Sequence, residues 1–494
     1  MPLITTGLPS PLRSIHIMGI CGTAMGAVAG MLKDAGYEVS GSDGAVYPPM
    51  SDYLAGLGIP VMSGYVAKNL DHKPDLVVVG NAIRAVYEEA EAVVAQDLNY
   101  CSFPHLLGEL FLNDQKSVVV AGTHGKTTTT AVTAWLLDQV GMAPGYLIGG
   151  VVRGWERTAR AGDGVYFVIE GDEYDTAFFD KQPKFLHYRA NVTILTSVEF
   201  DHADIYRDLA HVQESFKRLI AGMPADGRVI ARWDHATVRE VCQNAPCAIV
   251  KYGPGQDWDG RIDGVDHDRG VMKFSVLNDG VVVGRFESVL VGEHNLYNQV
   301  AVIAALLGEG ISADALAKAL KTFEGVKRRQ EVLGEPGGVT VLDDFAHHPT
   351  AVKVTTAALR LRFGGRRLWV VFEPRSNTSR RKVFQKEYGE AFDDADQIII
   401  ADTAPDTRRS PEERFSPGQL AADLRARGLE ATCLAEVDDI VATLAANVNE
   451  ADVVAVYSNG GFGGLHKKLL KALEDRFAEA AKADAKADVK AEKK

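Results

Sequence analysis

A phosphate-binding loop is the feature that most constrains how this chain of 494 residues can fold. A short apolar run at 118–121 leads into Gly-Thr-His-Gly-Lys-Thr at 122–127, and a segment with helical periodicity follows at 131–140. This order predicts a buried strand, a loop and a helix. Glycines let backbone N–H groups crowd around an anion, and a helix N-terminus adds about half a positive charge. The lysine can reach terminal phosphates and the next hydroxyl can bind Mg²⁺, so we predict a nucleotide-phosphate site.

One position departs from the general phosphate-loop pattern. That pattern places a glycine six residues before the lysine, where this chain has Val120. Gly-x-x-Gly alone also occurs in tight turns that bind nothing. The Lys-Thr-Thr that follows the loop and the apolar run that precedes it favour the phosphate site.

Composition limits the classes of protein to which the chain can belong. With 46% hydrophobic and 24% charged residues it resembles an ordinary globular protein, and its length suggests about three domains. The net charge of −13 disfavours nucleic acid or an anionic membrane surface as the main partner. No apolar run approaches ~18 residues, and the five cysteines lack metal-ligand spacing. We expect a cytoplasmic protein with reduced cysteines.

Residues 1–113 are predicted to form a first α/β domain. A strand at 15–18 is followed by a glycine-rich turn at 19–26, and further strands are expected at 37–43 and 76–81. Strands that alternate with helices indicate a doubly wound parallel sheet, with its ligand at the carboxyl ends of the strands. The glycine spacing G-x-x-G-x-x-x-G breaks the dinucleotide fingerprint, which argues against a dehydrogenase. The turn can still bind a pyrophosphate, or its glycines can serve only helix–strand packing.

Residues 114–325 are predicted to form a second domain, which contains the phosphate loop. A strand at 165–169 carries Glu170 at its end, where an acid beside a phosphate loop is suited to bind Mg²⁺. His202 follows the next strand and either binds a divalent ion or caps a loop, and the sequence leaves both open. Asn295 lies at the start of a predicted helix, where it either faces a ligand or caps the helix.

Residues 326–477 are predicted to form a third α/β domain. Its predicted strands are 339–342, 368–372, 397–401 and 452–457. The first of these strands leads into the acids and imidazoles of 343–348, which suit a metal or a nucleotide, and we rank nucleotide contact first. The basic run 327–329 is a candidate γ-phosphate clamp or a solvated charge run, and the glycine-rich loop 458–464 is a candidate anion binder. The segment 478–494 has no apolar stripe, so we expect a frayed or disordered tail.

In this combination and order, the motifs resemble the Mur ligase family over about residues 15–477. The residues that carry the resemblance are Gly122-Thr123-His124-Gly125-Lys126-Thr127, Glu170, Asp201-His202, His294-Asn295-Leu296-Tyr297-Asn298, Arg329 and Asp344-Phe345-Ala346-His347-His348-Pro349. The resemblance implies an α/β fold with a Rossmann-like UDP-binding domain, a central P-loop ATPase-like domain and a C-terminal α/β domain that closes over ATP.

The family forms amide bonds in peptidoglycan metabolism, so the resemblance implies an ATP-dependent, ADP-forming ligase that uses Mg²⁺, with a pair of divalent ions. The segments 170–180, 184–189 and 458–466 resemble the subgroup that joins UDP-N-acetylmuramate to the recycled tripeptide L-Ala-γ-D-Glu-meso-diaminopimelate. The alternative is the subgroup that adds L-alanine to the same nucleotide in de novo synthesis, because both share the ATP-site residues. We expect small-molecule substrates, no nucleic-acid or membrane partner, and a monomer or weak homodimer.

The resemblance also implies roles for individual residues. The expected catalytic residues are Lys126, Glu170, His202 and Arg329, and the expected metal ligands are Thr127, Glu170 and His202. The residues expected to bind ATP are Gly122, Thr123, His124, Gly125, Lys126, Thr127, Thr128, Asn295, Arg329, Asp344 and His348. Those expected to bind the UDP-sugar are Gly19, Cys21, Gly22, Thr23, Ala24, Met25, Ser42, Asp43 and Asn81.

One departure from the family concerns a carbamylated lysine that several relatives carry downstream of the Asp-His pair. The corresponding position here is Phe216, with Lys217 beside it, so we expect no carbamyl-lysine metal bridge. A diaminopimelate carboxylate in the acceptor would need an arginine, because its planar fork matches a carboxylate. The candidates are Arg375, Arg380, Arg408 and the loop 458–464.

Overall fold

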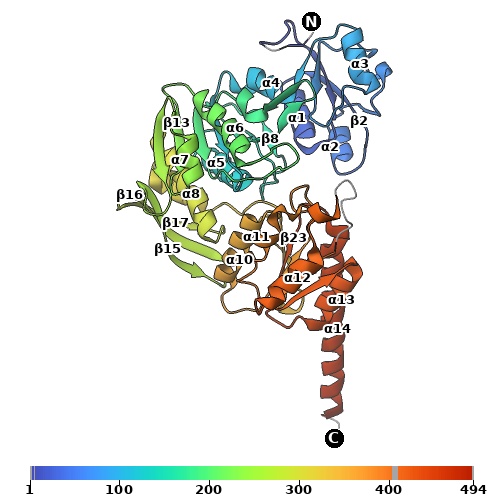
Figure 1. Cartoon of the computed structure of the whole chain (residues 1–494), viewed down its shortest axis with the longest axis vertical. Helices are drawn as coiled ribbons and strands as arrows, with labels where there is room; N and C mark the ends of the chain where they lie inside the picture. The colour runs from blue at the N-terminus through green and yellow to red at the C-terminus, as the bar shows by residue number, and fades with distance from the viewer. Residues whose placement is uncertain (1–2, 5, 403–409, 492–494) are drawn as a thin grey trace.

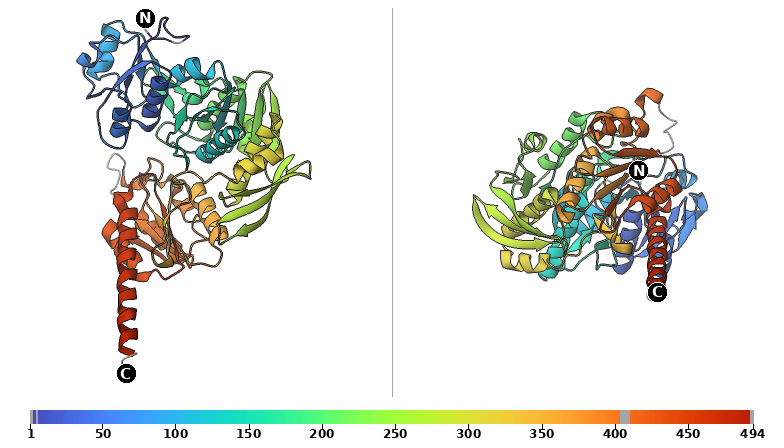
Figure 2. Two further views of the ribbon diagram at one scale, coloured as in Figure 1. Left: turned by 180° about the vertical axis from the view of Figure 1, so that it is seen from behind. Right: turned by 90° about the horizontal axis from the view of Figure 1, so that it is seen from below.

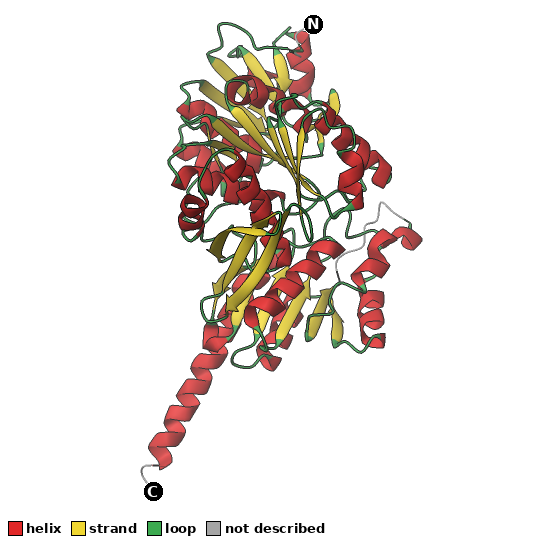
Figure 3. Ribbon diagram, turned by 90° about the vertical axis from the view of Figure 1, so that its left-hand side faces the viewer, coloured by secondary structure: helices red, strands yellow, loops and turns green. Residues whose placement is uncertain are grey.

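The structure is a computed structural model that describes residues 3–4, 6–402 and 410–491. Most of its strands belong to three sheets that follow one another along the chain, and helices accompany each sheet (Figure 1). Figure 3 shows the strands, in yellow, gathered among these helices. The arrangement confirms the predicted three-part α/β architecture.

The N-terminal sheet contains five parallel strands in the order β3-β2-β1-β4-β5. Its strands are β1 (Ser14–Met18), β2 (Glu38–Asp43), β3 (Val61–Ser63), β4 (Leu76–Val79) and β5 (Tyr100–Ser102). Its helices are α1 (Thr23–Asp34), α2 (Met50–Gly56), α3 (Glu88–Ala95) and α4 (Phe103–Leu107). The strand order reverses beside β1, so the turn between β1 and α1 opens at the switch point where such sheets bind ligands.

The central sheet has ten strands in the order β17-β16-β15-β14-β13-β12-β6-β9-β7-β8. These are β6 (Lys116–Ala121), β7 (Gly145–Leu147), β8 (Ala159–Arg160), β9 (Tyr166–Gly171), β12 (Val192–Leu195), β13 (Arg228–Arg232), β14 (Ala248–Tyr252), β15 (Trp258–Asp266), β16 (Val271–Asn278) and β17 (Val281–Ser288). The strands β6, β9 and β12 are parallel neighbours. The loops that follow them therefore meet at one edge of the sheet.

The helices α5 (Lys126–Gln139) and α8 (Glu293–Gly308) pack together beside the central sheet. The remaining helices of this part are α6 (Leu209–Ala221), α7 (Ala236–Val241) and α9 (Ala313–Leu320). A separate hairpin pairs β10 (Asp175–Ala177) with β11 (Asp180–Pro183) just after β9.

The C-terminal sheet has the order β18-β19-β23-β20-β21-β22, and only β18 is antiparallel to its neighbour. Its strands are β18 (Glu331–Gly334), β19 (Thr340–Asp344), β20 (Leu368–Phe372), β21 (Gln397–Ala401), β22 (Ala431–Leu434) and β23 (Val453–Tyr457). Val370 and Val371 belong to two different hydrophobic cores, since successive side chains of a strand face opposite sides of the sheet. The predicted strands 368–372 and 397–401 are confirmed to the residue.

The helices of the C-terminal part are α10 (Pro349–Phe363), α11 (Gln385–Tyr388), α12 (Pro417–Ala426), α13 (Val437–Asn447) and α14 (Leu465–Ala491). Where the sequence predicted a frayed or disordered tail from residue 478, α14 continues to Ala491 and stands away from the rest of the molecule (Figure 2). Alanine, lysine and glutamate have high helix propensity, so the backbone extends the helix without an apolar stripe. Among the described residues, no helix combines the length and apolarity needed to cross a membrane.

Candidate active site between the central and C-terminal domains

The phosphate loop connects β6 to α5, as the sequence predicts. Gly122 and Gly125 have φ angles of +134° and +79°, which L side chains rarely adopt. A Cβ at Gly125 would lie only 2.7 Å from Asn298 Oδ1, so a larger residue at this position would clash with Asn298. The helix α5 begins without a side-chain cap. Its first N–H groups are therefore available to an anion, as the loop prediction requires.

Lys126 is held by Glu173, an acid that was not among the predicted site residues. Its Nζ lies 2.9 Å from Glu173 Oε2 and donates to Gly122 O at 2.6 Å. His202 Nε2 lies 3.0 Å from the other carboxylate oxygen of Glu173. Burial would lower the pKa of Lys126, but the attraction of Glu173 outweighs burial and raises it. Glu173 therefore connects the phosphate-loop lysine to His202.

Thr127, Glu170 and Arg329 meet at the start of α5. Thr127 Oγ1 donates to Glu170 Oε2 at 3.3 Å, and Arg329 Nη2 donates to Thr127 Oγ1 at 3.3 Å. Burial raises the pKa of Glu170. Thr127 and Glu170 thus present a hydroxyl and a carboxylate side by side. Arg329 brings a cation from the segment just before β18 to the same point.

The third predicted metal ligand, His202, has a different partner. Its hydrogen bond goes to Glu173, whereas Thr127 and Glu170 pair with each other. His202 has a φ of +52°, an uncommon conformation for a residue with a Cβ. Burial would lower the pKa of His202, but the hydrogen bond to Glu173 raises it. That His202 binds a metal stays a prediction.

A cavity of about 850 Å³ opens between the central and C-terminal domains. Every residue predicted to bind ATP lines this cavity except Gly122, and Glu170 and His202 line it as well. Ligand pockets in proteins typically measure ~300–1,000 Å³, so a nucleotide fits. ATP binding by these individual residues stays a prediction.

The structure separates two interpretations of Asn295. The N-cap of α8 is Gly292, which has no side chain with which to cap the helix. Asn295 instead lies inside the first turns of α8, where Nδ2 donates to Val291 O at 3.0 Å and Oδ1 lies 3.4 Å from Asn298 Nδ2. Asn295 therefore does not cap the helix, and its amide lies at the cavity wall.

The two acids at the end of β19 hold neighbouring segments in place. Asp344 accepts hydrogen bonds from the N–H groups of Gln330 at 2.7 Å and Ala346 at 2.8 Å, and burial raises its pKa. Asp343 Oδ2 pairs with Arg328 Nε at 3.1 Å. Arg328 is thus part of an ion pair, not of a solvated charge run. Neither acid belongs to a group of metal-binding geometry within the part of the chain that the structure describes.

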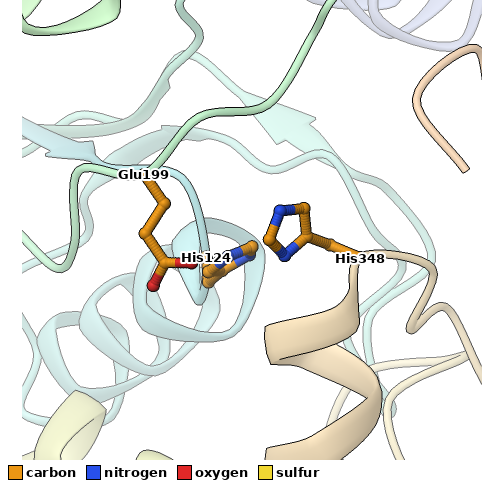
Figure 4. Close-up of side chains that lie close together, drawn as sticks. All are labelled: His124, Glu199 and His348. Carbon is orange, nitrogen blue, oxygen red and sulfur yellow. Dashed lines mark hydrogen bonds and ion pairs between the residues drawn. The ribbon is translucent and has the colours of Figure 1, made fainter. Parts of the chain in front are cut away.

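His348 joins a cluster of three side chains from three loops. It is the N-cap of α10, and burial lowers its pKa to about 4. One ligand atom each from His348, His124 and Glu199 lies within 4.8 Å of the others (Figure 4). Glu199 was not among the predicted site residues. Its only local signal is its position two residues before Asp201 in the loop after β12.

The glycine-rich turn of the N-terminal domain uses its glycines in two ways. A Cβ at Gly26 would lie 2.3 Å from Met50 Sδ, so this glycine serves the packing of α1 on α2. Gly19 has a φ of +84° and forms the turn. Gly22 is exposed, and α1 begins after it at Thr23 without a side-chain cap. The start of α1, where Ala24 is also exposed and Met25 half-buried, is therefore open to a phosphate.

The other predicted UDP-binding residues lie around this turn. Asp43 holds it, since its carboxylate accepts hydrogen bonds from Cys21 N–H at 2.9 Å and Ala45 N–H at 3.1 Å. Ser42 is buried, and its hydroxyl has no hydrogen-bond partner among the described residues. Asn81 is exposed after β4. Contact of these residues with a UDP-sugar stays a prediction.

Of the remaining predicted positions, those that the structure describes lie outside the cavity lining. Phe216 is fully buried with its ring 5.3 Å from that of Phe185, and Lys217 forms an ion pair with Glu240 at 2.8 Å. Arg375 lies against the loop 458–464, because a Cβ at Gly460 would lie 1.8 Å from its Nη1. The other two arginine candidates are Arg380, whose Nε has no hydrogen-bond partner among the described residues, and Arg408, which lies outside the described residues.

Comparison with protein-family models matches three consecutive regions of the chain. Residues 14–115 match the model described as Mur ligase family, catalytic domain. Residues 120–306 match the Mur ligase middle domain, and residues 328–460 match the Mur ligase, glutamate ligase domain. The matched regions follow the three sheets.

Full-length relatives agree with these matches. The chain is 40% identical over 472 residues to UDP-N-acetylmuramate–L-alanyl-γ-D-glutamyl-meso-2,6-diaminoheptandioate ligase of Escherichia coli (strain K12), covering 94% of this chain and 99% of that protein. It is 33% identical over 460 residues to UDP-N-acetylmuramate–L-alanine ligase of Anaeromyxobacter sp., covering 93% and 98%. The crystal structure of a murein peptide ligase from Psychrobacter arcticus matches with a TM-score of 0.67 and 33% identity, covering 94% and 99%. The chain therefore belongs to the Mur ligase family.

Proposed function

We propose that this Mur ligase joins UDP-N-acetylmuramate to L-Ala-γ-D-Glu-meso-diaminopimelate in peptidoglycan recycling, using ATP and releasing ADP and phosphate. The observation that carries the choice of acceptor is the 40% identity, over nearly the full length of both chains, to the Escherichia coli ligase with this name. The alanine-adding relative from Anaeromyxobacter reaches 33% over similar coverage. The higher identity favours the tripeptide over L-alanine.

The proposed reaction has two steps. An oxygen of the muramoyl carboxylate attacks the γ-phosphorus of ATP. The bond from the γ-phosphorus to the bridging β-phosphate oxygen breaks, ADP departs, and the carboxylate becomes an acyl phosphate. The free α-amine of the tripeptide then attacks the acyl carbon, loses a proton and expels phosphate, which completes the amide. Phosphoryl transfer needs alignment and charge neutralisation more than covalent help from the protein.

The cations of the cavity supply that charge neutralisation. Lys126 contacts the β- and γ-phosphates from the phosphate loop, and Arg329 contacts the γ-phosphate from the C-terminal domain. Two features support these roles: the ion pair with Glu173 keeps Lys126 charged, and Arg329 already reaches Thr127 at 3.3 Å. Because the two cations come from different domains, a triphosphate between them favours the closed arrangement.

The donor set fits a magnesium ion. Thr127 Oγ1 and Glu170 Oε2 are hard oxygen ligands that lie 3.3 Å apart, and Mg²⁺ prefers such ligands together with substrate phosphates. When bound, Mg²⁺ offsets negative charge on the β- and γ-phosphates. We propose that Thr127 and Glu170 hold this ion. His202 would serve a second ion after its nitrogen is released from Glu173.

The remaining residues position the two nucleotides. Asn295 reads the adenine, and Asp344 and His348 contact the ribose or phosphates. The turn 19–26 takes the pyrophosphate of UDP through the start of α1, and Ser42 offers a hydroxyl that has no hydrogen-bond partner within the described part of the chain. Both nucleotides are cytoplasmic metabolites, so we propose that the enzyme acts in the cytoplasm, as a monomer or weak homodimer.

Phosphate release tests the proposal directly. The assay contains ATP, Mg²⁺ and UDP-N-acetylmuramate, with either L-Ala-γ-D-Glu-meso-diaminopimelate or L-alanine as acceptor. Turnover with the tripeptide alone is the expected result. Turnover with L-alanine alone would assign the enzyme to de novo synthesis, and no release with either acceptor would contradict the ligase activity.

A further inference from the structure

We infer that His124, Glu199 and His348 form a binding site for a borderline transition-metal ion, with Zn²⁺ as its best-suited occupant, separate from the proposed magnesium ions. Among the residues that the structure describes, these side chains form the only group of His, Cys, Asp or Glu with metal-binding geometry. Two imidazoles and one carboxylate are a common ligand set for zinc and a poor one for Mg²⁺. Three protein ligands leave the fourth position open.

The distance between two of the ligand atoms already matches that in a tetrahedral zinc site. His124 Nε2 lies 3.3 Å from Glu199 Oε2. Zinc bonds of about 2.0–2.2 Å in a tetrahedron place two ligand atoms about 3.3–3.6 Å apart. The third ligand atom, from His348, lies within 4.8 Å of both. Figure 4 shows the two imidazoles on facing loops with their rings close together, and the ring centroids are 4.7 Å apart.

The surrounding hydrogen bonds orient the ligands. His348 Nε2 lies 3.3 Å from the carbonyl oxygen of Phe200, which can only accept, so Nε2 carries the proton and Nδ1 carries the lone pair. The N–H of Thr350 donates to that Nδ1 at 3.2 Å, and the Thr350 hydroxyl donates to Glu199 Oε2 at 2.7 Å. Histidine ligands of zinc commonly donate their other N–H to a carbonyl in this way. The ion takes the Nδ1 lone pair in place of the Thr350 N–H.

The three ligands join two domains. His124 belongs to the phosphate loop and Glu199 to the loop after β12, whereas His348 is the N-cap of α10 in the C-terminal domain. A bound ion therefore fastens the two walls of the cavity to each other. Since an ion that binds only the folded, closed state stabilises that state, Zn²⁺ should raise the melting temperature of the protein.

Cobalt absorption tests the site, because Co²⁺ accepts the same ligands as Zn²⁺ and its visible bands report tetrahedral coordination. The full chain, freed of metal and without nucleotide, is titrated with Co²⁺ and then with Zn²⁺. We expect intense visible bands that Zn²⁺ abolishes. Glu199→Gln and His348→Gln should each weaken Co²⁺ binding at least about tenfold and remove the Zn²⁺-induced rise in melting temperature.

Two control variants locate the ion. His347→Gln removes a neighbouring imidazole that lines the same cavity but is outside the ligand group, so it should keep the bands. His202→Gln removes the histidine of the proposed magnesium site and should also keep them. Absence of tetrahedral bands in the wild type would overturn the inference, as would bands lost in His202→Gln and kept in both ligand variants. Melting temperatures without metal identify any variant that fails to fold. The titration contains no nucleotide, so its outcome is independent of the ligase assay.

Discussion

Lys126 of the phosphate loop and Glu173, which follows β9, form a buried ion pair, with Nζ 2.9 Å from Oε2 and only 15% and 2% of the two side chains exposed. The carboxylate keeps the lysine charged in surroundings that would otherwise lower its pKa. It also holds His202 at 3.0 Å. One acid thereby holds both the lysine of the phosphate loop and the imidazole beside it.

Lys126→Met should abolish most ligase activity. Methionine keeps the length of the side chain but removes the charge that the transferring phosphate needs, and losing one such electrostatic contact costs about 10²–10³-fold in kcat. Phosphate release at saturating substrates measures this effect. Lys181→Met removes an exposed lysine whose partner is Asp175, so it is the matched control with unchanged turnover. Near-normal turnover in Lys126→Met would show that the loop lysine does not contact the phosphates.

Glu173→Gln should move the pH dependence of the reaction. The hydrogen bond to Glu173 raises the pKa of His202, and a proposed metal ligand works only as the neutral imidazole. Removing the charge lowers this pKa, so the acidic limb of the kcat profile should shift to lower pH, while kcat at pH 8 falls about tenfold through lost positioning. Glu173→Asp should keep the wild-type profile. A fall in kcat with an unmoved profile would mean that Glu173 does not set the protonation of His202.

Arg329→Lys should weaken ATP binding although it keeps the charge. Arg329 reaches Thr127 from the other domain at 3.3 Å, and a planar guanidinium can contact a phosphate and the hydroxyl together, which an ammonium does poorly. We expect the KM for ATP to rise about tenfold, since losing one hydrogen bond to a charged group costs about 1.5 kcal/mol. Arg269→Lys, on an exposed turn, is the control. An unchanged KM for ATP would show that the γ-phosphate is contacted by another residue.

Local patterns of the sequence predicted the phosphate loop and several strands, because each depends on residues adjacent in the chain. The strand 368–372 is an apolar run, as expected for a strand buried on both faces of a parallel sheet. Glu173 could not be assigned in this way, since it meets Lys126 across 47 residues. Glu199 is still harder to assign, because Thr350, which fixes its carboxylate, lies 151 residues away in another domain. Those contacts follow from the tertiary fold alone.

Removal of residues 478–494 should leave activity and melting temperature unchanged. Among the side chains that the structure describes, Phe477 of α14 packs on the body of the protein, since its ring lies where a Cβ at Gly337 would point, and Arg476 donates to Ala445 O at 2.6 Å. The next three residues are exposed. A melting temperature within about 1 °C of the full chain is expected, since surface changes usually alter stability by less than 0.5 kcal/mol. Truncation before Leu473, a buried residue, is the contrasting variant that should destabilise.

Lys217→Ala should retain full activity, and added bicarbonate should not stimulate the enzyme. Lys217 forms an ion pair with Glu240, 41% and 51% exposed respectively, and does not line the cavity. A lysine there cannot bridge metals as a carbamate. Stimulation by bicarbonate that disappears in Lys217→Ala would contradict this prediction.

Acid should destabilise the protein through two buried histidines. Burial lowers the pKa values of His294 and His348 to about 4, whereas unfolded histidine titrates near 6.5. Between these values the unfolded state binds more protons, so stability is fully present above pH 6.5 and falls as the pH approaches 4, by about 2–3 kcal/mol for each residue. Urea midpoints from pH 7 to pH 4.5 should therefore decline steeply in the wild type and less steeply in His294→Gln. His267→Gln, which replaces an exposed histidine, should decline like the wild type. Equal slopes in all three proteins would show that His294 is not kept neutral by burial.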